Sequence, residues 1–434
     1  MAPPNPTIVV PGITATYLKD HYPLPPEKMW TVLTKEFERI ALHPDDLRYE
    51  AIEPARVVPD QLYEIAYKEL VEELRFNLRE KESQPVPVFP FGYDWRQPLE
   101  ITEKELARFI EEVISRTLLL KHYAKSEYAN DPKVNLVGHS MGGLIIAGYL
   151  ASEKKKAPVG KVVTLAAPFQ GSFEAVIKVI TGTADLGTKA PSSRERRAAR
   201  LTPALYHLIP SFKNGLLPES LPDGALFDHA NWQKSVIDTI ADYIRNRGLP
   251  GEAPTKRALN LFDGMLKQAY AHRKRVSNFN LSDAGLTQDD WLAVIGVNAK
   301  TRVRLTLKKA GQRMHFDLKS ADRDNRWGHA DPAVARMTGD GTVPFEGAVP
   351  PFIDYQKLVC VSPDDYGYWE LQDRAVTKLA GFHGILPNMN MLHRLIVRFF
   401  TGKKDKYKNT WGRPAPGVDN WVSPIEGLRL REEK

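Results

Sequence analysis

The chain has 434 residues, of which 42% are hydrophobic, so it can bury a substantial core in one large domain or in two or three average ones. Lysine and arginine exceed aspartate and glutamate by 60 − 53 = 7. This mild excess is compatible with transient contact with an anionic lipid surface, but it does not indicate a nucleic-acid-binding protein.

The cysteine content and the first residues bear on the compartment. Cys360 is the only cysteine, which excludes an intrachain disulfide and suits a reducing environment. No apolar run approaches the roughly 18 residues that a membrane-spanning helix requires. Residues 1–6 (MAPPNP) lack the charged and apolar regions of a secretion signal. We therefore expect a cytoplasmic protein, or a secreted one if a signal has been removed.

The first hundred residues predict two buried strands with a helix between them. Residues 7–13 (TIVVPGI) are rich in β-branched side chains, which is typical of a parallel strand covered on both faces. Apolar residues at helical spacing predict a helix over residues 61–79. Residues 86–92 (VPVFPFG) predict the end of a second buried strand.

The loop after this second strand carries Tyr93-Asp94-Trp95-Arg96. An acid and a base two residues apart beside two aromatic residues indicate an ordered loop. A structural ion pair between Asp94 and Arg96 is favoured over direct catalysis. Farther on, Thr102-x-x-Glu105 matches a capping box and predicts the start of the next helix.

Residues 134–143 (VNLVGHSMGG) contain Gly138-x-Ser140-x-Gly142 between a strand-like and a helix-like run. This is the nucleophile-elbow pattern of α/β-hydrolases. A sharp turn lifts the serine hydroxyl clear of the sheet, and glycines remove Cβ atoms that would collide. The helix start then directs free N–H groups at a developing oxyanion. The pattern predicts Ser140 as the nucleophile and Met141 as an oxyanion-hole residue. A chance match in a glycine-rich loop is disfavoured by the flanking elements.

A second oxyanion N–H commonly comes from the residue that follows a glycine at the end of an earlier strand. Ile13 follows Gly12 at such a strand end and is therefore a candidate. An ordinary turn from strand to loop explains the same position equally well.

The alternation of strands and helices predicts a doubly wound, mostly parallel sheet with the site beyond the carboxyl ends of its strands. After residue 172 this alternation stops, and amphipathic helical pieces predict a mostly helical cap inserted over the site. We therefore expect a first core part (1–172), a cap (173–290), a second core part (291–402) and a surface-wrapping tail (403–434).

The second core part is predicted to resume with a buried strand at residues 291–297. A hairpin over 301–307 and 312–318, with its turn at Lys308-Lys309-Ala310-Gly311, follows from alternating polarity. An acidic loop (339–344, GDGTVP), a last strand (357–361) and a helix (389–400) complete the predicted core.

A serine nucleophile needs a base and an orienting carboxylate, which α/β-hydrolases place in the order Ser, Asp or Glu, His. After Asp340 only His383 and His393 remain. His383 lies in a glycine-bearing loop, whereas His393 falls inside an apolar helix, so His383 is favoured. Asp340 by itself is typical of an Asp-Gly turn and has rivals in Asp331, Asp364 and Asp365.

Six motifs in order resemble the lecithin:cholesterol acyltransferase family, which includes related phospholipases and bacterial members. The resemblance implies a triad of Ser140, Asp340 and His383 and a carboxylic ester, often of a lipid, as substrate. The chain departs from the animal enzymes in lacking their disulfides. The sequence of its predicted cap shows no traceable match to theirs. The motifs are Pro11-Gly12, Tyr93-Asp94-Trp95-Arg96, Gly138-His139-Ser140-Met141-Gly142-Gly143, Ala167-Pro168-Phe169-Gln170-Gly171-Ser172, Gly339-Asp340-Gly341-Thr342-Val343-Pro344 and His383-Gly384-Ile385.

The expected function is therefore a lipase, esterase or phospholipase-like serine hydrolase that works through an acyl-enzyme, with no cofactor or metal. An alternative is an O-acyltransferase that passes the acyl group to an alcohol. An alternative of another class is a non-catalytic binding module on a hydrolase scaffold. The sequence assigns neither substrate-binding residues nor an oligomeric state.

Overall fold

The computed structural model describes residues 3–22, 24–31, 33–52, 55–153, 156–183, 191–311, 313–367, 370 and 381–431, without the side chains of residues 310, 313 and 320. Parts of the predicted cap (184–190), hairpin (312) and tail (432–434) lie outside these residues.

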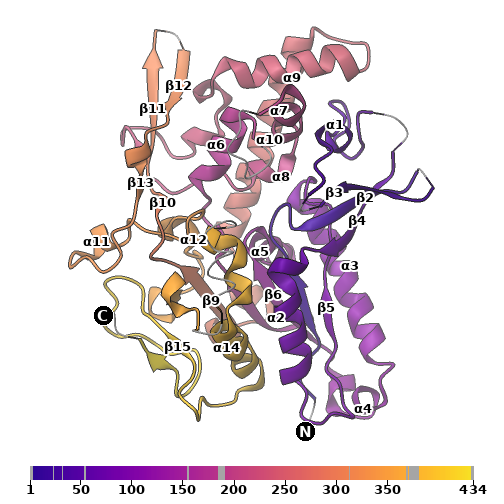
Figure 1. Cartoon of the computed structure of the whole chain (residues 1–434), viewed down its shortest axis with the longest axis vertical. Helices are drawn as coiled ribbons and strands as arrows, with labels where there is room; N and C mark the ends of the chain where they lie inside the picture. Colours follow the sequence, from indigo (N-terminus) through magenta and orange to yellow (C-terminus); the bar gives the residue numbers. More distant parts are fainter. Residues whose placement is uncertain are drawn as a thin grey trace.

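The centre of the molecule is a six-stranded sheet with the order β14-β9-β7-β6-β1-β5 (Figure 1). Every neighbouring pair in it is parallel, as the runs of β-branched residues predict. The strands are β1 (Thr7–Val10), β5 (Val88–Pro90), β6 (Val134–His139), β7 (Val159–Leu165), β9 (Trp291–Gly296) and β14 (Val359–Val361).

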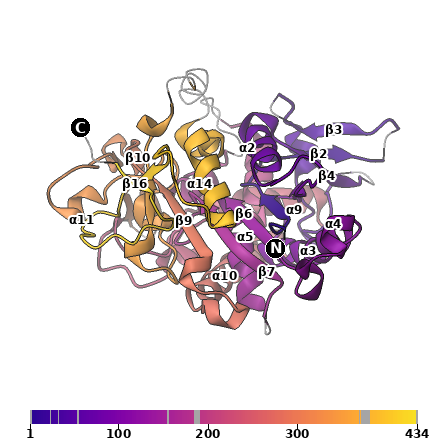
Figure 2. The same cartoon turned by 90° about the horizontal axis from the view of Figure 1, so that it is seen from below.

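Helices cover both faces of this sheet (Figure 2). Successive strand side chains point to opposite faces, so Ile8 and Val10 belong to one buried cluster and Val9 to the other. The first cluster includes α3 (Leu99–Thr117) and α5 (Met141–Ser152), and the second includes α2 (Glu64–Asn77) and α14 (Asn390–Thr401). The predicted doubly wound, parallel architecture is confirmed.

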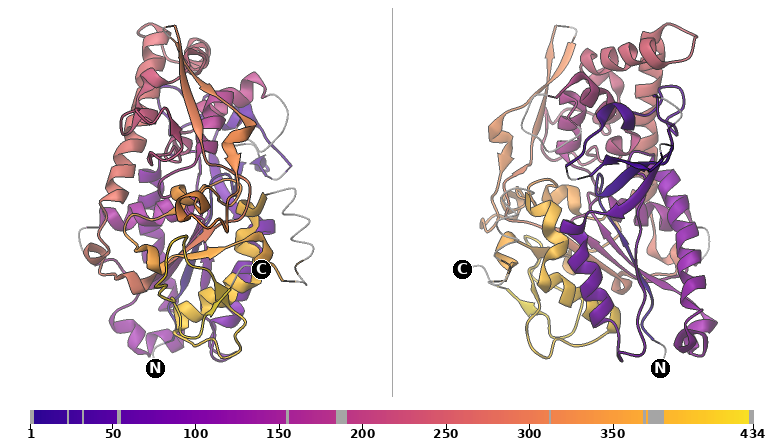
Figure 3. Two further views of the ribbon diagram at one scale, coloured as in Figure 1. Left: turned by 90° about the vertical axis from the view of Figure 1, so that its left-hand side faces the viewer. Right: turned by 45° about the vertical axis from the view of Figure 1, so that its right-hand side comes forward.

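The helices of the predicted cap segment (residues 173–290) lie at the end of the molecule opposite the N-terminus (Figure 1). α10 runs from that end towards the sheet (Figure 3). The described part of this segment is mostly helical: α6 (Phe173–Thr181), α7 (Ser193–Arg200), α8 (Pro203–Tyr206), α9 (Lys234–Arg247) and α10 (Pro254–Ser277).

Two further pieces of chain lie at the same end of the molecule (Figure 1). One is an antiparallel sheet of β2 (Thr16–Asp20), β3 (Glu27–Trp30) and β4 (Val57–Leu62), with α1 (Phe37–Ile40). The other is the hairpin of β11 (Leu305–Ala310) and β12 (Arg313–Asp317), whose β11 pairs with β8 (Leu216–Leu217) of the cap segment. At least one pair of strands therefore joins the predicted cap segment to the predicted second core part.

The remaining short elements lie in the connections. They are β10 (Thr301–Arg302), β13 (Arg323–Asp324), β15 (Trp411–Gly412), β16 (Arg429–Leu430), α4 (Lys121–Ala124), α11 (Pro332–Ala335) and α12 (Phe345–Ala348).

Two predicted helix starts are wrong. Leu62 ends β4 and pairs with Thr16 of β2, so α2 begins only at Glu64. Pairing with a distant strand satisfies the backbone groups that a helix would otherwise have used. α3 begins at Leu99, after Pro98, and Thr102 is buried inside it, so no capping box forms there. Proline is tolerated at a helix start because it has no N–H to leave unpaired.

The predicted hairpin is antiparallel as expected, but its turn is placed wrongly. Lys308 and Lys309 belong to β11 and pair with His315 and Met314 of β12. The strand continues to Ala310, and Gly311 follows with a φ of 63°. Glycine adopts this left-handed conformation without steric cost, which allows the turn to form there.

Candidate active site

Ser140 lies between the end of β6 and the start of α5, in the sharp turn that the sequence predicts. Its φ of 53° and ψ of −127° are uncommon for a residue with a side chain. The Ser140 N–H donates to the carbonyl of Leu165 on β7 at 2.9 Å, which holds the turn against the neighbouring strand. The serine is buried and stands at the carboxyl end of the central strand.

The turn is possible because glycines let the backbones approach closely. A Cβ at Gly142 would lie 2.2 Å from the carbonyl oxygen of Val10 on β1. A Cβ at Gly143 would lie 2.4 Å from Cβ of Ala167, and one at Gly138 would lie 2.8 Å from the Gly143 nitrogen. Each distance is shorter than a van der Waals contact, so a side chain at any of the three would displace α5.

His383 and Asp340 meet Ser140 in a hydrogen-bonded line. Nε2 of His383 is 2.9 Å from Oγ of Ser140, and its Nδ1 is 2.6 Å from Oδ2 of Asp340. A carboxylate accepts, so the neutral imidazole carries its proton on Nδ1 and presents the Nε2 lone pair to the serine hydroxyl. This arrangement allows the imidazole to remove the serine proton.

The carboxylate of Asp340 is itself held by its loop. Its Oδ1 accepts from the N–H groups of Thr342 at 2.9 Å and Val343 at 2.7 Å. The next residue, Gly341, donates its N–H to Oγ1 of Thr301 at 2.8 Å. The side chain of Asp340 is almost completely buried, so the acid is oriented before any substrate arrives.

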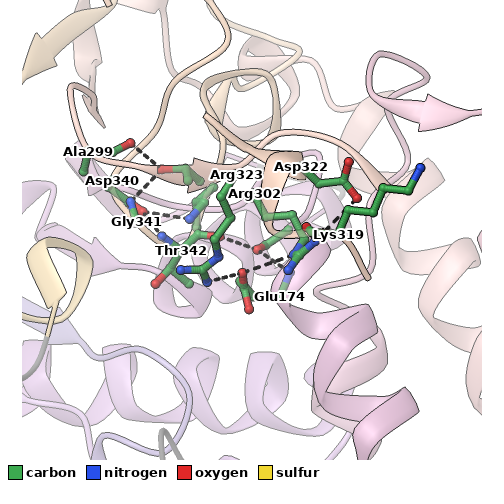
Figure 4. Close-up of polar contacts among 12 residues, drawn as sticks. Glu174, Ala299, Arg302, Lys319, Asp322, Arg323, Asp340, Gly341 and Thr342 are labelled. Atoms are coloured by element: carbon green, nitrogen blue, oxygen red, sulfur yellow. Dashed lines mark hydrogen bonds and ion pairs between the residues drawn. The ribbon is translucent and has the colours of Figure 1, made fainter. Parts of the chain in front are cut away.

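The Asp340 loop is also tied to the start of α6 (Figure 4). Oγ of Ser172 donates to the carbonyl of Thr342 at 2.5 Å, and Glu174 follows in the first turn of the helix. Glu174 pairs with Arg323 at 2.5 Å and lies 3.6 Å from Nε of Arg302. Arg302 and Arg323 are opposite each other in the β10–β13 pair, so this ion-pair group joins the acid loop to the cap segment.

The rival acids and the rival histidine have other partners. Asp331 caps α11 by accepting from the Ala333 N–H, and Asp365 pairs with Arg413 at 2.5 Å. Asp364 lies 3.3 Å from the Asn298 amide. His393 is buried in α14 and donates from Nε2 to the carbonyl of Pro387 at 2.6 Å. Burial lowers the pKa of His393 from its ordinary value to about 4.

Both predicted oxyanion residues are close to the serine, Met141 as the next residue in the chain and Ile13 through the neighbouring Gly12. Met141 is the first residue of α5, where N–H groups have no partner within the helix. Ile13 follows Gly12, at which an added Cβ would lie 3.0 Å from Cβ of Ser140. The peptide groups of both residues therefore adjoin the nucleophile candidate, and their role in catalysis stays a prediction.

The loop with Tyr93-Asp94-Trp95-Arg96 is ordered by ion pairs, as predicted. Arg96 is buried and pairs with Asp94 at 2.7 Å and with Glu50 at 2.7 Å. It also donates to the carbonyl of Ile40 at 3.0 Å, which joins this loop to the N-terminal antiparallel region. Arg96 therefore has a structural role.

Sequence reasoning missed two buried residues beside the site. The Tyr67 hydroxyl contacts both the Gly12 N–H and the His139 ring, and His139 reaches the main chain of His383. His139 stands inside the elbow motif, which was the available signal. Tyr67 has only the apolar helical spacing of a core residue, so no local pattern distinguished it.

The cap segment is anchored on the loop that follows β7. Arg273 of α10 donates to the carbonyl of Pro168 at 3.0 Å, to that of Phe169 and to that of His207 at 2.6 Å. The Ser211 N–H donates to the carbonyl of Gln170 at 2.8 Å. Burial lowers the pKa of Arg273 to about 9. These contacts place part of the cap segment at the carboxyl ends of the strands.

Within the described ranges, no cluster of three or more histidine, cysteine or acidic side chains could hold a metal ion. Among the described helices, none is both long and apolar enough to span a membrane.

Comparison with known proteins supports the family suggested by the motifs. Residues 53–249 match the sequence model of the family described as Lecithin:cholesterol acyltransferase. A curated protein of Arabidopsis thaliana, "Lecithin-cholesterol acyltransferase-like 4", is 24% identical over 201 residues, which are 39% of this chain and 35% of the relative. The chain thus spans about a third of the length of this relative.

One solved structure with a TM-score above 0.5 supports the fold. The structure titled "The crystal structure of Tle4-Tli4 complex" aligns with a TM-score of 0.56 at 14% identity, over 81% of this chain and 90% of that one. Lipase 1 from Pelosinus fermentans aligns with a TM-score of 0.32 at 12% identity, over 83% and 92% of the two chains. The chain therefore has the α/β-hydrolase fold, and residues 53–249 are similar in sequence to the lecithin:cholesterol acyltransferase family.

Proposed function

We propose that this protein is a serine hydrolase of carboxylic esters that acts on lipid-like substrates through an acyl-enzyme. The observation that carries the proposal is the line of hydrogen bonds from Ser140 through His383 to Asp340, at the carboxyl ends of the parallel strands. A nucleophile, a base and an orienting acid in this geometry form the constellation used for acyl transfer.

In the first half-reaction, Oγ of Ser140 attacks the ester carbonyl carbon while Nε2 of His383 takes the serine proton. The carbonyl electron pair moves onto the oxygen, and the N–H groups of Met141 and Ile13 bind that oxyanion. Asp340 stabilises the imidazolium that forms. When the intermediate collapses, the bond to the leaving alcohol breaks, His383 protonates that alcohol and the acyl group stays on Ser140.

In the second half-reaction, His383 removes a proton from water as the water oxygen attacks the acyl carbon. The bond to Ser140 breaks, the serine regains its proton from His383 and a carboxylic acid leaves. An alcohol in place of water would yield a new ester by the same steps. The proposal favours hydrolysis because water is always available, and the family match supports a lipid-like acyl group.

The test combines active-site labelling with an ester panel. A fluorophosphonate probe should label Ser140 in the wild-type chain, as peptide mass spectrometry would show. Ser140→Ala should lose the label and lower turnover by a factor on the order of 10⁶, without a change in circular dichroism. Retention of a tenth of the turnover would rule out Ser140 as the nucleophile. A wild-type chain without label or turnover would instead favour a binding module.

The panel consists of p-nitrophenyl esters from acetate to palmitate, measured with and without a long-chain alcohol. Turnover should favour the longer acyl chains, and free acid should be the main product even when the alcohol is present. A new ester as the main product would assign the chain to the acyltransferases.

A further inference from the structure

Two buried tyrosines hold one peptide group next to the nucleophile candidate. Tyr93 donates from its hydroxyl to the carbonyl of Pro11 at 2.8 Å, and the Gly12 N–H donates to the Tyr67 hydroxyl at 2.9 Å. These two backbone atoms belong to the same peptide unit. With both of its polar groups held by buried hydrogen bonds, the plane of this peptide is determined. The next peptide, which carries the Ile13 N–H, starts from that fixed orientation.

The Tyr67 hydroxyl also forms a hydrogen bond with the ring of His139. Its oxygen accepts from the Gly12 N–H and lies 2.6 Å from Nδ1 of His139. Because Nε2 of His139 faces the carbonyl of His383, a neutral ring carries its proton there, and the Tyr67 hydroxyl donates to Nδ1. Burial raises the pKa of Tyr67 and holds the pKa of His139 well below its usual range. Tyr67 and His383 are the titratable groups that contact the His139 ring within the described residues. Both partners of the hydrogen bond are therefore neutral.

The other nitrogen of His139 reaches the predicted base. Its Nε2 is 2.9 Å from the carbonyl oxygen of His383, which can only accept. The His383 N–H donates to the carbonyl of Asp340 at 3.1 Å. Both main-chain polar groups of His383 are thus held, one by the acid residue and one by His139. A single direction of donation runs from Gly12 through Tyr67 and His139 to His383.

We infer that Tyr67 and His139 are positioning residues that couple the Ile13 side of the oxyanion hole to the backbone of His383. The inference rests on the proposed serine-hydrolase function. Neither side chain needs to touch the substrate. Their hydrogen bonds set the distance between the N–H that binds the oxyanion and the imidazole that carries the proton, and both must be correct in the same transition state.

The kinetic test uses substitutions that each remove the hydrogen bonds of one of these two side chains. Tyr67→Phe removes the acceptor for Gly12 and the donor to His139, and His139→Leu removes the donor to His383. Each should lower kcat for a p-nitrophenyl ester about 10- to 100-fold with KM nearly unchanged. His139→Gln places an amide N–H where Nε2 stood, so it should recover most of the loss.

The matched control is Tyr123→Phe. Tyr123 is also buried, and its hydroxyl also bonds to the main chain, where it donates to the carbonyl of Pro4 at 2.7 Å. Its loss should lower thermal stability by a similar amount and leave kcat unchanged. Unchanged kcat in both Tyr67→Phe and His139→Leu, in an active wild-type background, would overturn the inference. A wild-type chain without esterase activity or probe labelling would refute the proposed function.

A spectroscopic readout tests the line without activity. In the full chain labelled with ¹⁵N-histidine, the His139 imidazole should be present as the Nε2–H tautomer and stay neutral between about pH 5 and pH 8. Its signal should vanish in His139→Gln and shift in Tyr67→Phe. A His139 ring that takes up a proton in this interval, or that carries its proton on Nδ1, would contradict the direction of donation.

Discussion

Ser140 has a backbone conformation that a serine keeps only when its surroundings impose it. A positive φ at a residue with a side chain costs on the order of 1–3 kcal/mol and persists where the structure over-determines it. Here the restraints are the bond to Leu165 and the start of α5. The strained turn directs the hydroxyl at His383, so the cost is tied to the geometry that the proposed chemistry needs.

The two histidines that follow Asp340 in the sequence should respond differently to removal. His383→Ala deletes the proposed base and should lower turnover by a factor on the order of 10⁶. His393→Ala removes a buried ring that bonds to Pro387, so it should lower the melting temperature while folded protein keeps its turnover. The measurement is kcat per mole of folded protein beside a thermal melt.

Comparable losses of turnover in both variants would not distinguish His383 from His393 as the general base. A loss confined to His393→Ala would overturn the assignment of the base. Neither result depends on the oxyanion hole, since Met141 and Ile13 are unchanged in both variants.

At the scale of elements, the close approach of α5 to β1 determines where the helix start can lie. Two backbone oxygens, those of Val10 and Pro11, would lie 2.2 Å and 2.8 Å from a Cβ at Gly142. Main-chain atoms cannot rotate away as a side chain can, so the helix itself would have to move. The Met141 N–H would move with it, because Met141 begins the helix.

Gly142→Ala should therefore destabilise the fold by about 1–3 kcal/mol and reduce ester turnover. The matched control is Gly264→Ala within α10, where nothing lies within 4 Å of the added Cβ. That substitution should stabilise the chain by up to about 1 kcal/mol, because alanine favours the helix over glycine. Urea unfolding of both variants measures the difference. Equal stabilities would mean that α5 is not packed as closely as the Gly142 contacts indicate.

At the scale of the whole molecule, several buried histidines make stability depend on pH. Burial lowers the pKa of His139, His207 and His272 well below the usual range and that of His393 to about 4. An unfolded histidine takes up a proton near pH 6.5, whereas these stay neutral in the folded state. The unfolded state then binds more protons, so stability is present above about pH 6.5 and is lost as the pH falls.

Buried or half-buried carboxyls oppose this trend, because burial raises the pKa of Glu100, Glu103, Glu105 and Glu346. Burial raises the pKa of Glu103 from 4.5 to about 7, which adds stability as the pH falls through that interval. Three of the histidines have pKa values held well below the usual range, so their effect should be the larger one. The free energy of unfolding should therefore decrease from about pH 7 to about pH 5 in urea titrations. A rise in stability over this interval would show that Glu103 and other carboxyls dominate.

A substitution at His393 isolates the contribution of one histidine to the pH dependence of stability. His393→Gln keeps a donor for the carbonyl of Pro387 and removes the titrating ring. Between about pH 7 and pH 4 it should lose about 3 kcal/mol less than the wild-type chain, because the pKa of His393 is lowered from its ordinary value to about 4. If the free energy of unfolding of the variant and of the wild-type chain depended on pH in the same way, His393 would take up its proton as readily in the folded state as in the unfolded state.

The sequence by itself determined the parallel sheet, the strand-turn-helix at Ser140 and the family resemblance. These rest on local patterns: β-branched runs such as residues 7–10 belong in a doubly covered strand, and glycines at 138 and 142 permit a tight elbow. The order of Ser140, Asp340 and His383 was likewise readable, and their catalytic roles stay predictions.

Only the tertiary structure decided which polar groups meet across long stretches of chain. Asp340 could not be separated from Asp331 by local pattern, yet Asp340 lies at hydrogen-bond distance from His383 and Asp331 caps α11. Tyr67 has the spacing of a core residue, and only packing shows its hydroxyl between Gly12 and His139. The physical reason is that periodicity reports which face of an element is buried, whereas the partner of a buried polar group is chosen by the packing of distant elements.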